Sequence, residues 1–298
     1  MQDYIVRGTA GNGAVRVFVA TTRNLVNTAR ELHNTTPTAT AALGRLLIAA
    51  SIMGATLKNE SDIITLSIKG NGPIGGLVAT TDYKSRVKGY AFEPQIKHMK
   101  NELGKLDVGG AVGVGTLTVI KDLGLKEPVS GQIELVSGEI AEDITQYFAV
   151  SEQSPSSVAL GVLVDRDHSV KQAGGYIIQI MPEASEGAKE DIITYLEEKL
   201  YAFPAVTTLL DEGKTPEDIF NLLFDNRDVV IYDKIYPEYF CNCSIDRTRK
   251  VLLSVGLEEL ESILKEDKGA NLHCHFCNKD YYFDEGDIIE MISTIKPA

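Results

Sequence analysis

All four cysteines of this 298-residue chain lie in its last 58 residues, as two closely spaced pairs. The first pair has the pattern C-x-C, at Cys241 and Cys243, and the second has the pattern C-x-x-C, at Cys274 and Cys277. Two such pairs separated by a short folded insert are typical of a structural zinc site, in which four thiolates leave no coordination position open. We therefore predict a closed Zn²⁺ site at these cysteines.

Two other interpretations of the cysteines stay open at this point. The four thiols can be incidental in a reducing compartment, although their tight pairing and the lack of cysteine in the first 240 residues argue against this. His273 or His275 can replace a thiol as a ligand, although His275 lies between two cysteines, where the local turn would point it away from a metal.

The region 238–298 is too small to bury enough surface for secure folding on its own. Metal binding, worth about 10–16 kcal/mol in zinc peptides, would then supply most of its folding free energy. Thiolates held by a metal are already deprotonated, so peroxide or hypochlorous acid can oxidise them. If the metal leaves, the nearest partner of each cysteine is the other member of its own pair, and such small loops form readily reduced disulfides. The pattern therefore predicts a reversible switch.

Charge is distributed unevenly along the chain. Residues 1–182 carry 17 Lys+Arg and 17 Asp+Glu, whereas residues 183–298 carry 12 and 25. The shift indicates a boundary near Pro182 and counts against a nucleic-acid partner, because phosphate binding needs a basic surface. The N-terminus has no apolar core, and the longest apolar run, 46–57, has about half the length of a membrane span. We expect a cytoplasmic protein with no membrane segment.

The first part of the chain predicts an α+β fold. Residues 15–20 alternate in the strand period, and a helix follows through Leu25 and Leu32. A second helix begins with Thr36 as N-cap and Pro37 in its first turn, and it is apolar nearly all round, so it should be buried. Short strands and glycine turns fill most of the rest, at 62–70, 75–81, 86–92, 115–120, 130–138, 157–165 and 174–180, with an amphipathic stretch at 139–148.

Two short amphipathic helices are predicted after Pro182. The first has Ile192, Ile193, Leu196 and Leu200 on one face. The second begins with Thr215 as cap and Pro216 at its first position, and its apolar side contains Ile219, Leu222 and Leu223. Since helices this short are unstable alone, they should lie on the neutral body.

We therefore divide the chain into a mixed α/β body with twisted sheets, 1–182, a helical linker, 183–237, and a C-terminal four-cysteine domain, 238–298. The insert between the cysteine pairs should be helical, residues 280–283 should form a strand, and a last helix should pass through Ile288 and Ile295. Loss of the metal should loosen the linker helices and expose the apolar surface that they cover. An acidic segment would stay soluble once unfolded.

Three other functions can be proposed from features of the sequence, and each conflicts with another feature. The sequence GNGPIGG at 70–76 contains a G-x-G-x-x-G pattern, but a strand-like segment follows it where a dinucleotide-binding motif leads into a helix. A zinc-ribbon nucleic-acid regulator conflicts with the 7 Lys+Arg and 12 Asp+Glu of residues 238–298. A thiol oxidoreductase that uses Cys274 and Cys277 would need them at a helix N-terminus and would not need a second pair.

The cysteine pattern and several longer segments resemble the redox-regulated molecular chaperone family, heat-shock protein 33. The resemblance covers essentially the whole chain, and all four cysteine positions match. The other segments that carry it are 37–55, 70–79, 121–140, 151–164 and 173–182.

The resemblance implies a holdase that works without ATP, and hence not an enzyme, and that binds unfolding client proteins during oxidative stress. It implies an inactive reduced state with Zn²⁺ on Cys241, Cys243, Cys274 and Cys277. On oxidation, it implies disulfides Cys241–Cys243 and Cys274–Cys277, zinc release, and unfolding of the zinc domain and linker. Active members of the family tend to form homodimers.

Overall fold

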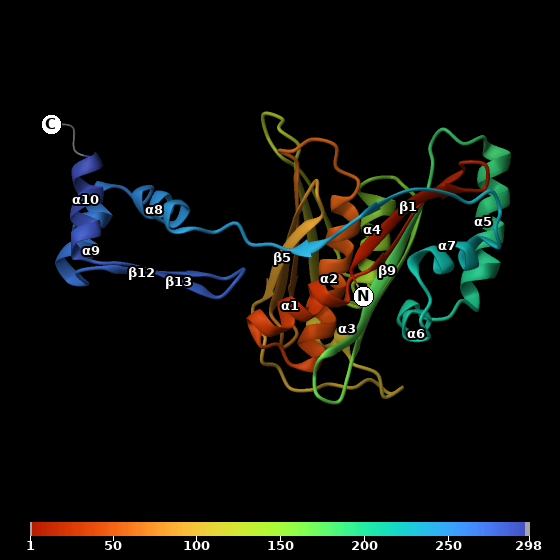
Figure 1. Cartoon of the computed structure of the whole chain (residues 1–298), viewed down its shortest axis with the longest axis horizontal. Helices are drawn as coiled ribbons and strands as arrows, with labels where there is room; N and C mark the ends of the chain where they lie inside the picture. Colours follow the sequence, from red (N-terminus) through yellow and green to blue (C-terminus); the bar gives the residue numbers. More distant parts are fainter. Residues whose placement is uncertain (1, 296–298) are drawn as a thin grey trace. The chain divides into compact units, whose positions relative to one another are not determined.

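The computed structural model describes residues 2–295, which form two compact units that meet at the Phe240–Cys241 bond. The first unit has two sheets around a central helix (Figure 1), and the second has a two-stranded sheet with three helices. The predicted α+β fold is therefore confirmed.

Both sheets of the first unit are antiparallel except for one short parallel pair, β5 with β11. The five-stranded sheet has the order β10-β1-β2-β9-β8, with β1 (Tyr4–Ala10), β2 (Val15–Thr21), β8 (Ser156–Val164), β9 (Val170–Ile180) and β10 (Val230–Ile235). The six-stranded sheet has the order β11-β5-β4-β3-β6-β7, with β3 (Ile63–Gly70), β4 (Gly76–Asp82), β5 (Arg86–Ala91), β6 (Gly115–Asp122), β7 (Val129–Glu134) and β11 (Glu238–Tyr239). The helices are α1 (Arg23–His33), α2 (Pro37–Gly54), α3 (Val108–Val112), α4 (Ala141–Val150), α5 (Glu186–Tyr201), α6 (Val206–Asp211) and α7 (Pro216–Phe224).

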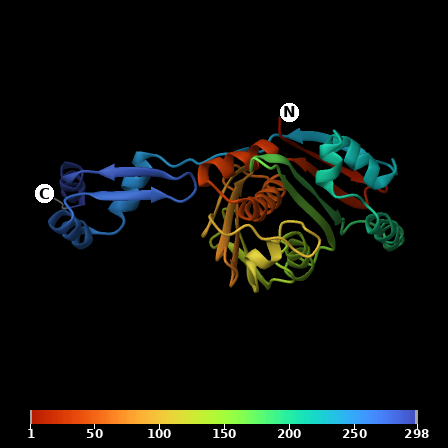
Figure 2. The ribbon, with the colours of Figure 1, turned by 90° about the horizontal axis from the view of Figure 1, so that it is seen from below.

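Helix α2 lies between the two sheets, and Figure 2 shows it enclosed by strands on both sides. Every residue of α2 except Arg45 is buried, as its nearly uniform apolar sequence predicts. Among the described helices α2 alone has the length and hydropathy of a membrane span, but 94% of it is buried in the protein, so it is a core helix. Thr36 is its N-cap residue, but the Thr36 hydroxyl donates to Pro94 O at 3.4 Å and does not cap the helix.

The five-stranded sheet is apolar on both faces. Along β2, Phe18 and Ala20 face the α2 side, whereas Val15, Val17 and Val19 face the opposite side, because successive side chains of a strand alternate. Helices α5, α6 and α7 cover this opposite face (Figure 1). The buried helix residues that pack there are Ile192, Leu196, Val206, Leu209, Leu210, Ile219, Phe220, Leu223 and Phe224.

Polar contacts also join helix α7 to strands β1 and β10. The Tyr4 hydroxyl donates to Glu217 Oε2 at 2.7 Å, and Lys234 Nζ lies 2.6 Å from Glu217 Oε1. Gly8 permits the close approach of β10, because a Cβ there would lie 2.2 Å from Val230 O and 2.8 Å from Phe220 Cε1. The segment 183–237 is thus packed on the body by helices and paired with it by a strand.

The short strand β11 lies directly before the first cysteine pair. It pairs with β5, and the Tyr239 hydroxyl donates to Gly89 O at 2.8 Å. His33 Nε2 lies 3.0 Å from the same hydroxyl, and Arg86 stacks 4.6 Å from the centre of the Phe240 ring. The chain is therefore held on the six-stranded sheet up to the residue before Cys241.

Several elements after Pro182 differ from the sequence-based prediction. Helix α6 and strand β10 were not predicted; α6 has only six residues, and β10 is mostly exposed and lacks a regular apolar alternation. Thr215 caps α7, as the sequence predicted, and the structure adds a capping box between Thr215 and Asp218. Leu222 is 39% exposed, however, and Phe220 takes its place on the buried side of α7.

The packing of α7 can be tested at Phe220, which is fully buried. We expect Phe220→Ala to lower the free energy of unfolding by about 3–5 kcal/mol, because it removes a large side chain that the surroundings cannot replace. Denaturant unfolding and protease sensitivity of residues 183–237 measure this effect. Leu222→Ala is the matched control on the same helix, and we expect it to cost under about 1 kcal/mol. Equal effects of the two substitutions would contradict the observed docking face.

Candidate metal centre

The second unit has a very small core. Its elements are α8 (Ile245–Leu253), α9 (Leu257–Glu266), β12 (Ala270–Cys274), β13 (Lys279–Phe283) and α10 (Glu285–Ile295). The buried core residues that it contains are Leu252, Leu260, Phe283, Ile288 and Met291. Arg249 adds a surface link between α8 and α10 through ion pairs with Asp287 at 2.8 Å and Glu290 at 3.1 Å. Such a core buries little apolar surface, so the unit needs a further source of stability.

A helix cap and a hairpin turn lie next to the two cysteine pairs. Cys243 directly precedes Ser244, whose hydroxyl caps α8 by accepting from Arg247 N at 3.3 Å. Cys274 ends β12, and the N–H groups of Cys277 and Asn278 both donate to Cys274 O, at 3.2 and 2.8 Å. The hairpin between β12 and β13 therefore points its two thiols toward the C-x-C segment.

The four sulfur atoms all lie within 4.8 Å of one another. Cys241 Sγ is 3.7 Å from Cys274 Sγ, and Cys243 Sγ is 3.2 Å from Cys277 Sγ. Zn–S bonds of about 2.3 Å place neighbouring sulfurs of a tetrahedron about 3.8 Å apart. The four-cysteine cluster is therefore consistent with a metal site, and both of these sulfur–sulfur contacts join one motif to the other.

The surroundings of the cluster shift the pKa values of its thiols in different directions. Burial raises the pKa of Cys241 and of Cys277. Burial also acts to raise the pKa of Cys243, but hydrogen bonds from Tyr281 and the neighbouring thiols outweigh it and lower that pKa to about 7. The sequence analysis did not identify Tyr281 as a site residue. Its position two residues before Phe283, which places both side chains on the same face of strand β13, was the feature that could have indicated it.

The two neighbouring histidines lie outside the cluster. His273 Nδ1 is 2.8 Å from Asp280 Oδ1, and His273 Nε2 is 3.3 Å from Asn278 Oδ1. The His275 ring packs edge-on against the His273 ring, with centroids 5.3 Å apart. In the described residues, the group of side chains placed to share a metal contains the four cysteines and neither histidine.

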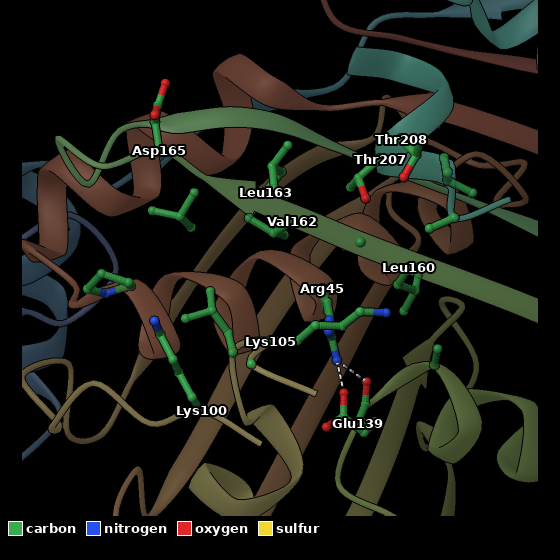
Figure 3. A pocket seen from close by; sticks show the side chains of 18 of the residues that line it. Arg45, Lys100, Lys105, Glu139, Leu160, Val162, Leu163, Asp165, Thr207 and Thr208 are labelled. Atoms are coloured by element: carbon green, nitrogen blue, oxygen red, sulfur yellow. Dashed lines mark hydrogen bonds and ion pairs between the residues drawn. The ribbon is translucent and has the colours of Figure 1, made fainter. Parts of the chain in front are cut away.

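A groove of about 1140 Å³ runs along β8 in the first unit (Figure 3). Leu160, Val162 and Leu163 of β8 line it, together with Thr207 of α6. Arg45 forms an ion pair with the Glu139 side chain and donates to Glu139 O at 3.1 Å on the opposite wall. The groove therefore has an apolar strand along one side and charged groups among its other lining residues, and α6 forms one part of its wall.

The geometry counts against two of the competing functions. The glycine-rich sequence 70–76 is a tight turn that leads into strand β4, not into a helix that could receive a phosphate. Cys274 and Cys277 lie at a hairpin between two strands, whereas a thiol oxidoreductase has its C-x-x-C at a helix N-terminus. The fold and cluster instead define a body with a small four-cysteine unit attached to it.

Known proteins match this chain over almost its whole length. The sequence profile of the Hsp33 protein family matches residues 3–284. The 33 kDa chaperonin of Clostridioides difficile (strain 630) is 52% identical over 296 residues, 99% of this chain and 100% of that protein. The 33 kDa chaperonin of Acetivibrio thermocellus is 48% identical over 296 residues, 99% of each chain. The crystal structure of the 33 kDa chaperonin from Thermotoga maritima matches with a TM-score of 0.90 and 36% identity, over 99% of both chains.

The chain therefore belongs to the Hsp33 family of chaperonins, a family of chaperones and not of enzymes.

The cluster predicts which substitutions abolish metal binding. We expect Cys243→Ser or Cys277→Ser to lose the tightly bound metal, because a hydroxyl does not replace a thiolate in a tetrahedral sulfur site. His273→Ala and His275→Ala are controls that should keep one metal ion per chain. Metal content of the purified proteins, measured by elemental analysis, checks this. Loss of the metal in a histidine variant and its retention in a cysteine variant would contradict the four-thiol site.

Proposed function

We propose that this protein is a redox-switched holdase whose resting state holds Zn²⁺ on Cys241, Cys243, Cys274 and Cys277. The observation that carries the proposal is the cluster of four sulfurs within 4.8 Å in a unit with very few buried apolar residues. Bound Zn²⁺ would hold the thiolates together and supply the folding free energy that this core lacks.

Oxidation by a hydroperoxide begins the switch. A thiolate sulfur attacks one peroxide oxygen, the O–O bond breaks, and the leaving hydroxide takes up a proton to form water. The resulting sulfenic acid is attacked by the neighbouring thiolate, which forms the disulfide and releases a second hydroxide. The expected pairs are Cys241–Cys243 and Cys274–Cys277. Because each pair lies within one motif, both disulfides can form after the two motifs have separated.

Unfolding of the metal unit then loosens the linker, 183–237. Apolar surface that α5–α7 cover would be exposed, including Val15, Val17 and Val19 of β2. The groove along β8 would open as well, because Thr207 and Thr208 of α6 line it. Exposed apolar surface binds unfolded client proteins without a sequence motif. We place this activity in the cytoplasm and expect the active form to be a homodimer.

The redox dependence is tested by light scattering of a thermally aggregating client protein. We expect suppression of aggregation only after treatment with peroxide at mildly raised temperature, with release of about one Zn²⁺ per chain from the closed site. A chelating dye measures the released metal in the same samples. Equal inactivity of the reduced and oxidised protein would leave a metal-binding protein without the proposed switch.

The linker coupling is tested without oxidation. We expect Phe220→Ala to suppress client aggregation in the reduced, zinc-loaded state, because it weakens the docking of α7 on β1 and β2. Leu222→Ala, at the exposed position on the same helix, should stay inactive until it is oxidised.

Removal of residues 183–298 should likewise give a body that binds clients constitutively. A docking variant and a truncated body that both bind no client would refute the coupling.

A further inference from the structure

A tyrosine hydroxyl reaches the sulfur cluster. The Tyr281 hydroxyl donates to Cys243 Sγ, with an O···S distance of 3.0 Å. Tyr281 lies on β13, beyond the C-x-x-C hairpin, whereas Cys243 belongs to the C-x-C segment. The bond therefore ties the two motifs together through a residue that is not itself one of the four thiols.

Packing fixes the Tyr281 ring in this position. Tyr281 and Phe283 share one face of β13, and Phe283 is buried in the core of the second unit, against which Tyr281 is half-buried. Tyr282 lies on the other face and is 67% exposed. Leu272 stands opposite Tyr281 on β12 in the hairpin register. The strand alternation thus directs one of two adjacent tyrosines to the sulfurs and the other to solvent.

A hydrogen bond of this kind changes the chemistry of a thiolate. A phenol is a good donor, and a bond from it to an anionic sulfur is charge-assisted. The donor withdraws electron density from the sulfur, so the thiolate becomes a weaker nucleophile and a weaker electron donor to a bound metal. Side chains that bond to metal ligands in this way commonly change metal affinity or activity by about 10- to 100-fold.

We propose that Tyr281 is a positioning residue that sets how readily the site responds to peroxide, by holding Cys243 and lowering the reactivity of its sulfur. The proposal rests on the zinc site of the proposed function. In the step concerned, the Cys243 thiolate attacks a peroxide oxygen, gives up two electrons, and becomes a sulfenic acid as hydroxide leaves. Tyr281 opposes this step because its hydrogen bond is strongest to the full negative charge that the attack consumes.

The test compares Tyr281→Phe with Tyr282→Phe in the full-length, zinc-loaded protein. Both variants lose one phenolic hydroxyl from neighbouring residues of β13, but only the first loses the bond to Cys243. With a fixed concentration of hydrogen peroxide and a chelating dye, we expect Tyr281→Phe to release zinc about tenfold faster than the wild type. Tyr282→Phe should release zinc at the wild-type rate.

Replacement of Zn²⁺ by Co²⁺ separates this effect from looser packing. Without the hydrogen bond, the sulfur-to-cobalt charge-transfer band should move to longer wavelength in Tyr281→Phe and stay in place in Tyr282→Phe. Equal zinc-release rates in wild type and Tyr281→Phe, or faster release with an unmoved band, would overturn the inference. Wild-type protein that binds neither metal would instead overturn the proposed function.

Discussion

The five-stranded sheet has apolar side chains on both faces, and each face must be covered for the first unit to stay soluble. Helix α2 covers one face permanently, because it is enclosed between two sheets. Helices α5–α7 cover the other from outside, joined to the body by β10 and by contacts such as Tyr4–Glu217. A cover that is packed on one side only can be removed with the body left intact, which is the property that a switchable holdase requires.

The second unit differs from the body in how it is stabilised. Its few buried residues cannot match the apolar core around α2, so a metal on four thiolates would contribute a large part of its stability. Strand β11 lies in the sequence between the body and the four-cysteine unit. Its Tyr239 hydroxyl is hydrogen-bonded to Gly89 O, and Tyr239 is only two residues before Cys241. Chemistry at the sulfurs would thus act next to the point where the chain leaves the six-stranded sheet.

Elements with a strong local signal were predicted well from the sequence. The apolar helix after Thr36, the helix cap at Thr215, and the strand at 280–283 all form as expected. The misses had weak or conflicting signals: α6 is a six-residue helix, and β10 is a largely exposed strand that exists through its pairing with β1. Leu222 was assigned to the buried side of α7 because apolar spacing alone does not distinguish it from Phe220.

The sequence by itself determined the candidate metal chemistry, because the types and spacing of the four cysteines already limit which metals and geometries they can serve. It also determined the family, through motifs spread along the whole chain. Only the tertiary structure decided which surface α5–α7 cover, and that Tyr281 rather than Tyr282 bonds to Cys243. Both depend on contacts between residues far apart in sequence, whose distances are set by packing and strand register and not by local pattern.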